Sequence, residues 1–346
     1  MVKKGVYIII MYLVLTMFLP FSTVKAAQGT MYRISGDNRY DTACRVATTN
    51  WTKSENVILV SGEGYADAIS ASVLSKKLDA PIIFTTPNEL SSEAKKALYL
   101  LKPKNIYVIG GDASISQSIR NNLKISYNLI ELSGVNRYET NIMVAKELVS
   151  LGVSPANIMV VGGEGFSDAL SVAPVAASKE QILLLANNDL NSMQPIIHFI
   201  KNNKSVITVV GTKNIINDAI YNAIGANTRI DGGSDRFETN LNVLNAFKND
   251  LHFDKVYIAN ASPMVPDNMY ADALVAATVA AKYLAPLVLV DKDPSTRLLD
   301  LNATDNAINF IKNNVESTFD LELIGGTKVI SQGTENAIDE YIIGFV

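Results

Sequence analysis

Histidine and cysteine are nearly absent from this chain of 346 residues, which has two histidines and a single cysteine, Cys44. One cysteine excludes a disulfide within the chain, so the fold must be stabilised by a core, which 48% hydrophobic residues can supply. No histidines and cysteines have zinc spacing, and no histidine is placed for a Ser-His-Asp or Cys-His set. We therefore expect no metal and no catalysis of these kinds.

A basic excess is also missing. The formal net charge is −4, and without the three lysines of the first 26 residues, a segment that contains no acid, it becomes −7. Proteins that bind DNA or RNA normally show a basic balance, so no nucleic acid partner is expected. An anionic polymer could still be bound, but only through local clusters of arginine and lysine.

Long apolar runs are missing except at the start of the chain. There, two lysines precede the apolar run Val6–Phe21, and small residues follow at Val24 and Ala26. This pattern predicts a secretory signal peptide at residues 1–26, and hence a secreted protein without a membrane after cleavage. An uncleaved membrane anchor is the alternative, but the run is short for a span.

What the chain does contain is one internal repeat, written three times. RISGDNRY, ELSGVNRY and RIDGGSDRF begin at Arg33, Glu131 and Arg229, about a hundred residues apart. SGEGYADAI, GGEGFSDAL and NMYADAL follow in step, and YVIGG, TVVGT and ELIGG come later in each unit. The sequence therefore predicts three tandem domains, which we call copy one (32–127), copy two (130–225) and copy three (228–346). Units of this length should each own much of a core.

Each copy alternates short apolar strands with helices. In copy one the predicted strands are Val57–Val60, Pro81–Phe84 and Ile106–Ile109. Wholly apolar strands alternating with helices indicate a parallel sheet covered on both faces, which is an α/β fold. Helices are predicted over residues 41–51, 67–77, 91–101 and 115–123. Copy three departs from the plan, because a proline-containing loop, Asn260–Met269, replaces the Gly-Glu-Gly turn.

Repeated arginines are the first candidate site residues. Arg39, Arg137 and Arg236 precede the first helix of each copy, and could either tie a loop to a carboxylate or present a donor fork to an anionic ligand. Arg33 and Arg229 add a second arginine in copies one and three. Copy two has a glutamate there, so we expect its site to be weaker or different.

Repeated aromatic and acidic residues are the next candidates. Tyr40, Tyr138 and Phe237 follow the arginines, as saccharide-contacting or helix-start core residues. The helix-start aspartates fit N-terminal positions stabilised by free N–H groups, although a ligand contact is the alternative. These aspartates are Asp67, Asp168 and Asp272.

Two enzyme-like interpretations of the second phrase are weak. Its glycines lack the G-x-G-x-x-G spacing and no Walker lysine follows, so we expect no nucleotide and no other cofactor. A carboxylate pair for glycan cleavage could come from Glu63 with Asp67, or from Glu164 with Asp168. Copy three lacks this glutamate, and the sequence as a whole does not indicate an enzyme.

Taken together, R(I/L)SG-x-NRYxT, GEG(Y/F)xDAL, the apolar strand and V(I/V)GG resemble the cell wall binding repeat type 2 family of Gram-positive surface proteins. The resemblance runs from about Tyr32 to the end of the chain. It implies three Rossmann-like parallel-sheet repeats packed as an intramolecular pseudo-threefold trimer, and grooves between repeats that hold an anionic secondary wall polysaccharide. The family's strand motif is associated with anchoring, and we expect its residues here to be core that shapes the groove. They are Ile82, Ile83, Phe84, Ile182, Leu183, Leu184, Leu287, Val288 and Leu289.

The implied function is noncovalent anchoring to the cell wall or coating as a surface-layer component, with other surface-layer proteins as further partners. Three weak sites on one rigid body would add avidity for a polymer. No residues remain for a second domain, so we expect an anchor module alone or a small coat protein. The alternatives are an exported glycan-acting hydrolase or transferase, and an adhesin that uses an apolar patch at Asn260–Met269.

Overall fold

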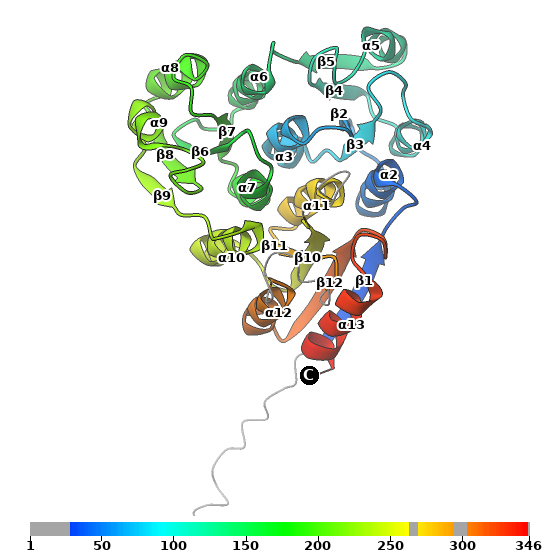
Figure 1. Cartoon of the computed structure of the whole chain (residues 1–346). Helices are drawn as coiled ribbons and strands as arrows, with labels where there is room; N and C mark the ends of the chain where they lie inside the picture. Colours follow the sequence, from blue (N-terminus) through cyan, green and yellow to red (C-terminus); the bar gives the residue numbers. More distant parts are fainter. Residues whose placement is uncertain (1–27, 263–268, 294–302, 345–346) are drawn as a thin grey trace, which may run out of the picture.

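A computed structural model describes residues 28–262, 269–293 and 303–344 of the chain (Figure 1). The predicted signal peptide lies outside the described residues. In these ranges no helix has the length and apolar character needed to cross a bilayer.

Three parallel sheets, each of four strands, form the framework, which confirms the predicted α/β class. The first has the order β3 (Ile82–Thr85), β2 (Asn56–Ser61), β4 (Asn105–Ile109), β5 (Asn128–Leu132). The second has the order β7 (Ile182–Ala186), β6 (Asn157–Gly162), β8 (Val206–Val210), β9 (Thr228–Ile230). The third has the order β11 (Leu287–Val290), β10 (Lys255–Asn260), β12 (Thr318–Ile324), β1 (Gln28–Ile34).

The fourth strand of every sheet comes from the first repeated phrase of the next copy. β5 leads into copy two yet pairs with β4, and β9 opens copy three yet pairs with β8. β1 closes the ring by pairing along its whole length with β12, from Gln28 opposite Thr318 to Ile34 opposite Ile324. The predicted copies therefore do not coincide with the sheets, and the two ends of the chain share one sheet.

Sequence analysis did not predict these fourth strands. They are edge strands with one covered side, and exposed or half-exposed residues make up most of β1, β5 and β9. Such strands lack the continuous apolar run by which the inner strands were recognised. Their pairing with a distant partner is a tertiary event.

Helices rich in small residues meet at the centre of the molecule. α3 (Ala66–Leu78), α7 (Ser167–Ser178) and α11 (Ala271–Lys282) contact one another, and Figure 1 shows them enclosed by the three sheets. Alanine and serine on almost every side allow the three helices to approach closely, and all but their ends are buried.

The first helix of each copy joins neighbouring copies. α2 (Arg39–Asn50) lies between β3 and α11, α6 (Arg137–Ser150) between β7 and α3, and α10 (Arg236–Phe247) between β11 and α7. The outer helices are α4 (Ser92–Leu101), α5 (Gln117–Lys124), α8 (Gln194–Asn203), α9 (Asp218–Ala223), α12 (Ala303–Asn314) and α13 (Gln332–Ile338). Two short helical turns, η1 (Lys248–Asp250) and η2 (Asp339–Ile343), complete the described elements.

Candidate functional site at the junctions between copies

The junctions between copies gather most of the repeated residues. We call the contact of copies one and two the first junction, that of copies two and three the second junction, and that of copies three and one the closing junction. Each is formed where a first phrase meets the helix start and the glycine turn of the preceding copy.

The three arginines that open α2, α6 and α10 make the same backbone contact. Nη1 of Arg39 donates to the carbonyl of Gly62 at 2.8 Å, and Nη1 of Arg137 donates to that of Gly163 at 2.7 Å. Nη1 of Arg236 donates to the Ala261 carbonyl at 2.8 Å. Each arginine thus ties its helix to the turn after the first strand of its own copy. The contact that all three share is with a backbone carbonyl.

An aromatic cluster lies on the pseudo-threefold axis beside these arginines. Tyr65, Phe166 and Tyr270 have ring centroids 4.9 to 6.0 Å apart. Arg137 lies 5.2 Å above the Tyr65 ring and Arg236 lies 4.8 Å above that of Phe166, so each arginine reaches back to the preceding copy. Sequence analysis missed these three residues, although an aromatic at the same place in every second phrase was a usable signal.

The aromatics that follow the arginines are packing residues at the helix start. A Cβ added to Gly62 would lie 2.6 Å from the Tyr40 ring, and one added to Gly163 would lie 2.7 Å from that of Tyr138. Phe237 is buried. Burial raises the pKa of both tyrosines. This placement matches the helix-start core alternative.

The three aspartates lie in the first turns of the central helices, as predicted, and point at the glycine of the third phrase. At the closing junction, a Cβ on Gly325 would lie 2.7 Å from Oδ2 of Asp272, and this glycine has φ +124°. Only glycine therefore fits there. The same approach occurs between Asp67 and Gly110, and between Asp168 and Gly211.

Burial raises the pKa of all three aspartates. Burial raises the pKa of Asp168 and Asp272 to about 6. A hydrogen bond with a threonine hydroxyl of the next copy, Thr239 for Asp168 and Thr42 for Asp272, lowers the pKa by a smaller amount. Asp67 also has a raised pKa through burial, although Ser114 donates to it at 2.8 Å. Asp168 and Asp272 therefore join neighbouring copies through a hydroxyl group, whereas the hydroxyl partner of Asp67 belongs to its own copy.

A second arginine holds the turn of the third phrase at the closing junction. Arg33 on β1 donates to the carbonyls of Gly325 at 2.5 Å and Ile330 at 3.2 Å. It also pairs with Glu335 on α13 at 2.8 Å. The guanidinium is half-buried and fixes the strand of copy one to the turn of copy three.

The other junctions achieve the same contact by other means. At the second junction Arg229 donates to the carbonyls of Gly211 and Ile216 at 2.6 and 2.8 Å, and lies 4.9 Å above the Tyr221 ring. At the first junction the strand carries a glutamate, and an arginine arrives from α5 instead.

Arg120 on α5 takes the place of the missing strand arginine. It donates to the carbonyls of Gly110 at 2.5 Å and Ile115 at 3.0 Å, and pairs with Glu131 on β5 at 2.9 Å. The strand and helix have exchanged charges relative to the closing junction. Glu131 is therefore part of a complete structural pair, and sequence analysis missed Arg120 because it falls outside the repeated phrases.

The predicted strand motif is core throughout. All nine of its residues are at most 3% exposed. In copies two and three a buried asparagine completes the backbone of this edge strand, since Asn141 bonds to the Leu183 carbonyl and the Leu185 N–H, and Asn240 does the same at Leu287 and Leu289. Direct contact of these side chains with a polymer is excluded by their burial.

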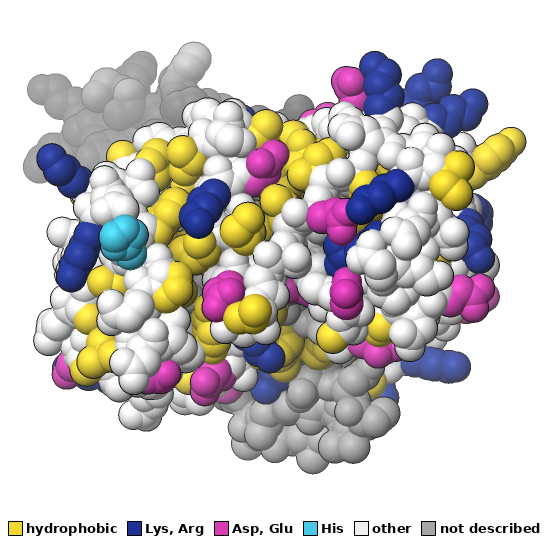
Figure 2. Space-filling view, turned by 90° about the horizontal axis from the view of Figure 1, so that it is seen from above, with side chains coloured by type: hydrophobic (Ala, Val, Ile, Leu, Met, Phe, Trp, Pro, Cys, Tyr) yellow, Lys and Arg dark blue, Asp and Glu magenta, His cyan; other side chains and the backbone are white. Residues whose placement is uncertain are grey.

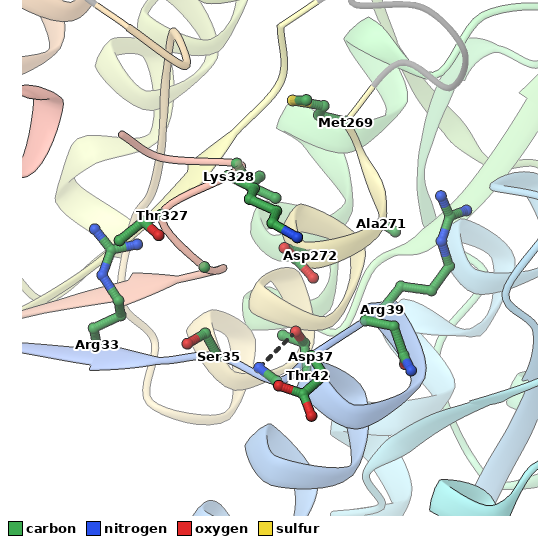
Figure 3. Close-up of a pocket in the computed structure, with 14 residues that line it drawn as sticks. Arg33, Ser35, Asp37, Arg39, Thr42, Met269, Ala271, Asp272, Thr327 and Lys328 are labelled. Atoms are coloured by element: carbon green, nitrogen blue, oxygen red, sulfur yellow. Dashed lines mark hydrogen bonds between the residues drawn. The ribbon is translucent and has the colours of Figure 1, made fainter. Parts of the chain in front are cut away.

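A pocket of ≈ 450 Å³ lies at the closing junction, and we call it the closing pocket. Its lining joins the first phrase of copy one to the start of α11 and to the turn of copy three (Figure 3). Lys328 leans over it, with its ammonium pointing toward the side of the pocket where Asp272 lies. Among the described residues Lys328 forms no hydrogen bond or ion pair. Arg33, Arg39, Ser35 and Thr327 also line the pocket.

Comparison with known proteins gives the three copies a family. A model described as cell wall binding domain 2 (CWB2) matches residues 33–120, 131–221 and 229–335. The chain belongs to this family. Its resemblance to cell wall binding repeats, inferred from the three phrases, is therefore confirmed, and membership supports association with the cell wall or cell surface.

Two relatives come from Bacillus subtilis (strain 168). The N-acetylmuramoyl-L-alanine amidase LytC is 30% identical over 336 residues, and the amidase enhancer is 30% identical over 337 residues. These alignments cover 96% and 93% of this chain, but 62% and 44% of the relatives. This CWB2 chain thus spans less than two thirds of the length of either relative.

Two solved structures from Clostridium difficile share the fold. Cwp6 and Cwp8 each superpose with a TM-score of 0.77 at 24% identity. The matches cover 92% and 91% of this chain, and 48% and 52% of those chains. They confirm the architecture of three α/β repeats.

Proposed function

We propose that this CWB2 chain anchors noncovalently to the cell wall by binding an anionic polysaccharide, and that the closing pocket is its principal site. The observation that carries the proposal is Lys328, an unpaired cation directed into a pocket between copies (Figure 3). Arg33 and Arg39 also line the pocket, as do the acids Asp37 and Asp272, but the Arg33 guanidinium is already paired with Glu335. A phosphate or carboxylate in the pocket would therefore meet the Lys328 ammonium and the Ser35 hydroxyl.

Local charge matters because the surface has no general basic field. On the face shown in Figure 2, lysines and arginines are interspersed with acids and apolar side chains. Together with the acidic net charge of −4, this disfavours an anion held by long-range attraction. A cluster such as that of the closing pocket is what an anionic polymer would need.

The remaining predicted contacts would act mainly by shaping the site. Arg137, Arg229 and Arg236 bond to backbone carbonyls, and Asp67, Asp168 and Asp272 lie against glycine turns. In this proposal they hold the copies in register, while the polymer contacts the cations that line the pocket. The chain would then serve as a non-catalytic anchor or coat at the cell surface, with other surface-layer proteins as neighbours.

The alternatives have less support. The Asp67 carboxylate accepts from Ser114 and the Asp168 carboxylate from Thr239, which leaves Glu63 and Glu164 without a free partner acid from this set. In the Asn260–Met269 loop, Asn260 and Ser262 are buried, while residues 263–268 lie outside the described part of the chain.

The test is co-sedimentation of the purified chain with cell walls, before and after acid extraction of their anionic polymer. Lys328→Glu should lower retention at least tenfold, because it reverses the unpaired charge in the pocket. Lys213→Glu is the matched control, since this lysine lies in the equivalent turn of copy two but pairs with Asp218 at 3.1 Å. The control should bind like the parent chain.

Three outcomes separate the possibilities. Loss of binding on extraction, together with loss in Lys328→Glu, supports the proposal. Binding that survives extraction overturns it and directs attention to peptidoglycan or a protein. Equal effects of the two lysine variants would place the polymer elsewhere than in the closing pocket.

A further inference from the structure

A second cleft lies next to the closing pocket, and the anion proposed for that pocket gives this cleft no role. It is an open cleft of ≈ 480 Å³ between β1, β12 and α2, and it shares Arg33 and Ser35 with the closing pocket. We call it the β1 cleft. Its other lining residues are Tyr32, Ile34, Arg45, Thr48, Thr49 and Glu322.

One carboxylate oxygen in this cleft lacks a partner. Glu322 is 9% exposed, and its Oε1 accepts from Nζ of Lys255 at 2.6 Å. Its Oε2 is buried and forms no hydrogen bond within the described structure. Tyr257, opposite Glu322 in strand register, has a buried hydroxyl in the same condition. Because leaving a buried polar atom unpaired is unfavourable, a hydrogen-bonding partner is missing at this place.

The rim of the cleft carries the groups that suit a sugar ring. Tyr32 is 57% exposed and lies opposite Glu322 in the pairing of β1 with β12. From α2, Thr48 and Thr49 add hydroxyl groups, and Arg45 adds a half-exposed guanidinium that pairs with Asp41. The aromatic face of Tyr32 can pack on the C–H groups of a sugar ring, and the Glu322 carboxylate can accept from its hydroxyl groups.

At the other two junctions, different residues occupy the positions equivalent to those that line the β1 cleft. At the first junction Tyr107 stands where copy three has Glu322, three residues before the repeated glycine, and it is buried. Glu147 stands at the place of Thr49, and its charge adds to burial in raising the pKa of Tyr107. At the second junction Thr208 occupies the place of Glu322. The acid, aromatic and hydroxyl groups come together where the ends of the chain meet.

We propose that the β1 cleft is a saccharide subsite that binds one neutral pyranose ring. The ring packs on Tyr32, and its hydroxyl groups donate to Oε2 of Glu322. The adjoining closing pocket then binds an anionic group of the same polysaccharide chain. This inference deepens the proposed function and rests on it for the polymer, but the binding of a free sugar does not depend on it.

The test is titration of the ¹⁵N-labelled chain with N-acetylglucosamine and with glucose as neutral probes. The Thr48 and Thr49 amides should shift with at least one sugar, with a weak, saturable dependence. Tyr32→Ala should weaken binding at least fivefold, and Tyr32→Phe should retain it because the ring is kept. Tyr99→Ala is the matched control, since Tyr99 is 75% exposed on α4, in copy one's own outer layer.

The outcomes also separate this subsite from the anion proposal. Sugar binding that is lost in Tyr32→Ala and kept in Lys328→Glu supports the subsite, whatever the wall assay shows. No shift of the Thr48 and Thr49 amides with either sugar overturns it, as does equal weakening by Tyr32→Ala and Tyr99→Ala. If sugar binding stands while wall retention is unaffected by polymer extraction, the proposed anchor function fails and the subsite remains.

Discussion

At the closing junction the arginine that holds the glycine turn comes from a strand, and at the first junction it comes from a helix. Arg33 pairs with Glu335, and Arg120 pairs with Glu131, so the charges are exchanged between the same two elements. Both guanidiniums bond to the carbonyl of the first glycine of the turn and to that of the isoleucine after the turn, Ile330 for Arg33 and Ile115 for Arg120. The fold therefore requires a guanidinium at that point in space, and either element can provide it.

The two junctions also differ in the charge of the turn itself. The closing junction has Thr327 and Lys328 after its glycines, whereas the first junction has Asp112 and Ala113 there. Asp112 lies 3.6 Å from Arg120 and is largely exposed. The same scaffold thus offers a cation at one junction and an acid at another, which argues against three equal binding sites for an anion.

The largest expected effect comes from removing the buried arginine of the first junction. Arg120→Ala should cost about 3–5 kcal/mol of unfolding free energy, because the side chain is 2% exposed and its loss leaves the buried carbonyls of Gly110 and Ile115 without their donor. Arg33→Ala should cost less, since Arg33 and Glu335 are more exposed. Urea unfolding of the two variants measures the difference.

A charge exchange sharpens that test. Arg120→Glu combined with Glu131→Arg should recover much of the loss, because it recreates the closing arrangement. Lys124 also pairs with Glu131, so both chains should carry Lys124→Gln to avoid a like-charge contact. A double variant no more stable than Arg120→Ala would show that the two arrangements are not interchangeable.

The next effect is on the pH dependence of stability. Asp272 has a folded-state pKa of about 6 against an ordinary 3.8, so the neutral form is favoured by folding. The resulting stability is fully present below about pH 4 and is lost as pH rises through 6, a change of up to about 3 kcal/mol. The free energy of unfolding of Asp272→Asn, relative to that of the parent chain, should therefore increase between pH 4 and pH 7.5, as measured by urea unfolding. If the difference in unfolding free energy between the variant and the parent chain does not change across that interval, the raised pKa of Asp272 does not affect stability.

The smallest expected effect is a gain of function at the first junction. Asp112→Thr with Ala113→Lys gives this turn the charges of the closing junction. In the Lys328→Glu background the exchange should restore wall retention by a factor of about 2–10, since a second site on the same rigid body can engage a polymer. Retention by cell walls at graded salt measures it. Absence of any recovery would indicate that the closing junction has a further requirement, such as the β1 cleft.

Much of the inner architecture could be predicted from local patterns. The strand predicted at Val57–Val60 lies inside β2, and Ile106–Ile109 lies inside β4, because continuous apolar runs bury on both faces. The repeated phrases located the junction residues, and family membership followed from them. Arg120, which lies outside the phrases, and Glu322, which differs from its counterparts within them, were not found, since no local pattern marks a residue whose role depends on a neighbouring copy.

By itself the sequence determined the number of copies, the parallel α/β unit and the identity of the residues that recur. Periodicity and repetition are local properties, so they are visible without coordinates. The tertiary structure alone decided that β1 joins β12, that Tyr65, Phe166 and Tyr270 meet on one axis, and that Lys328 faces a pocket. Some of these contacts join residues from nearly opposite ends of the sequence. They form because each edge strand and each helix start is completed only by another copy.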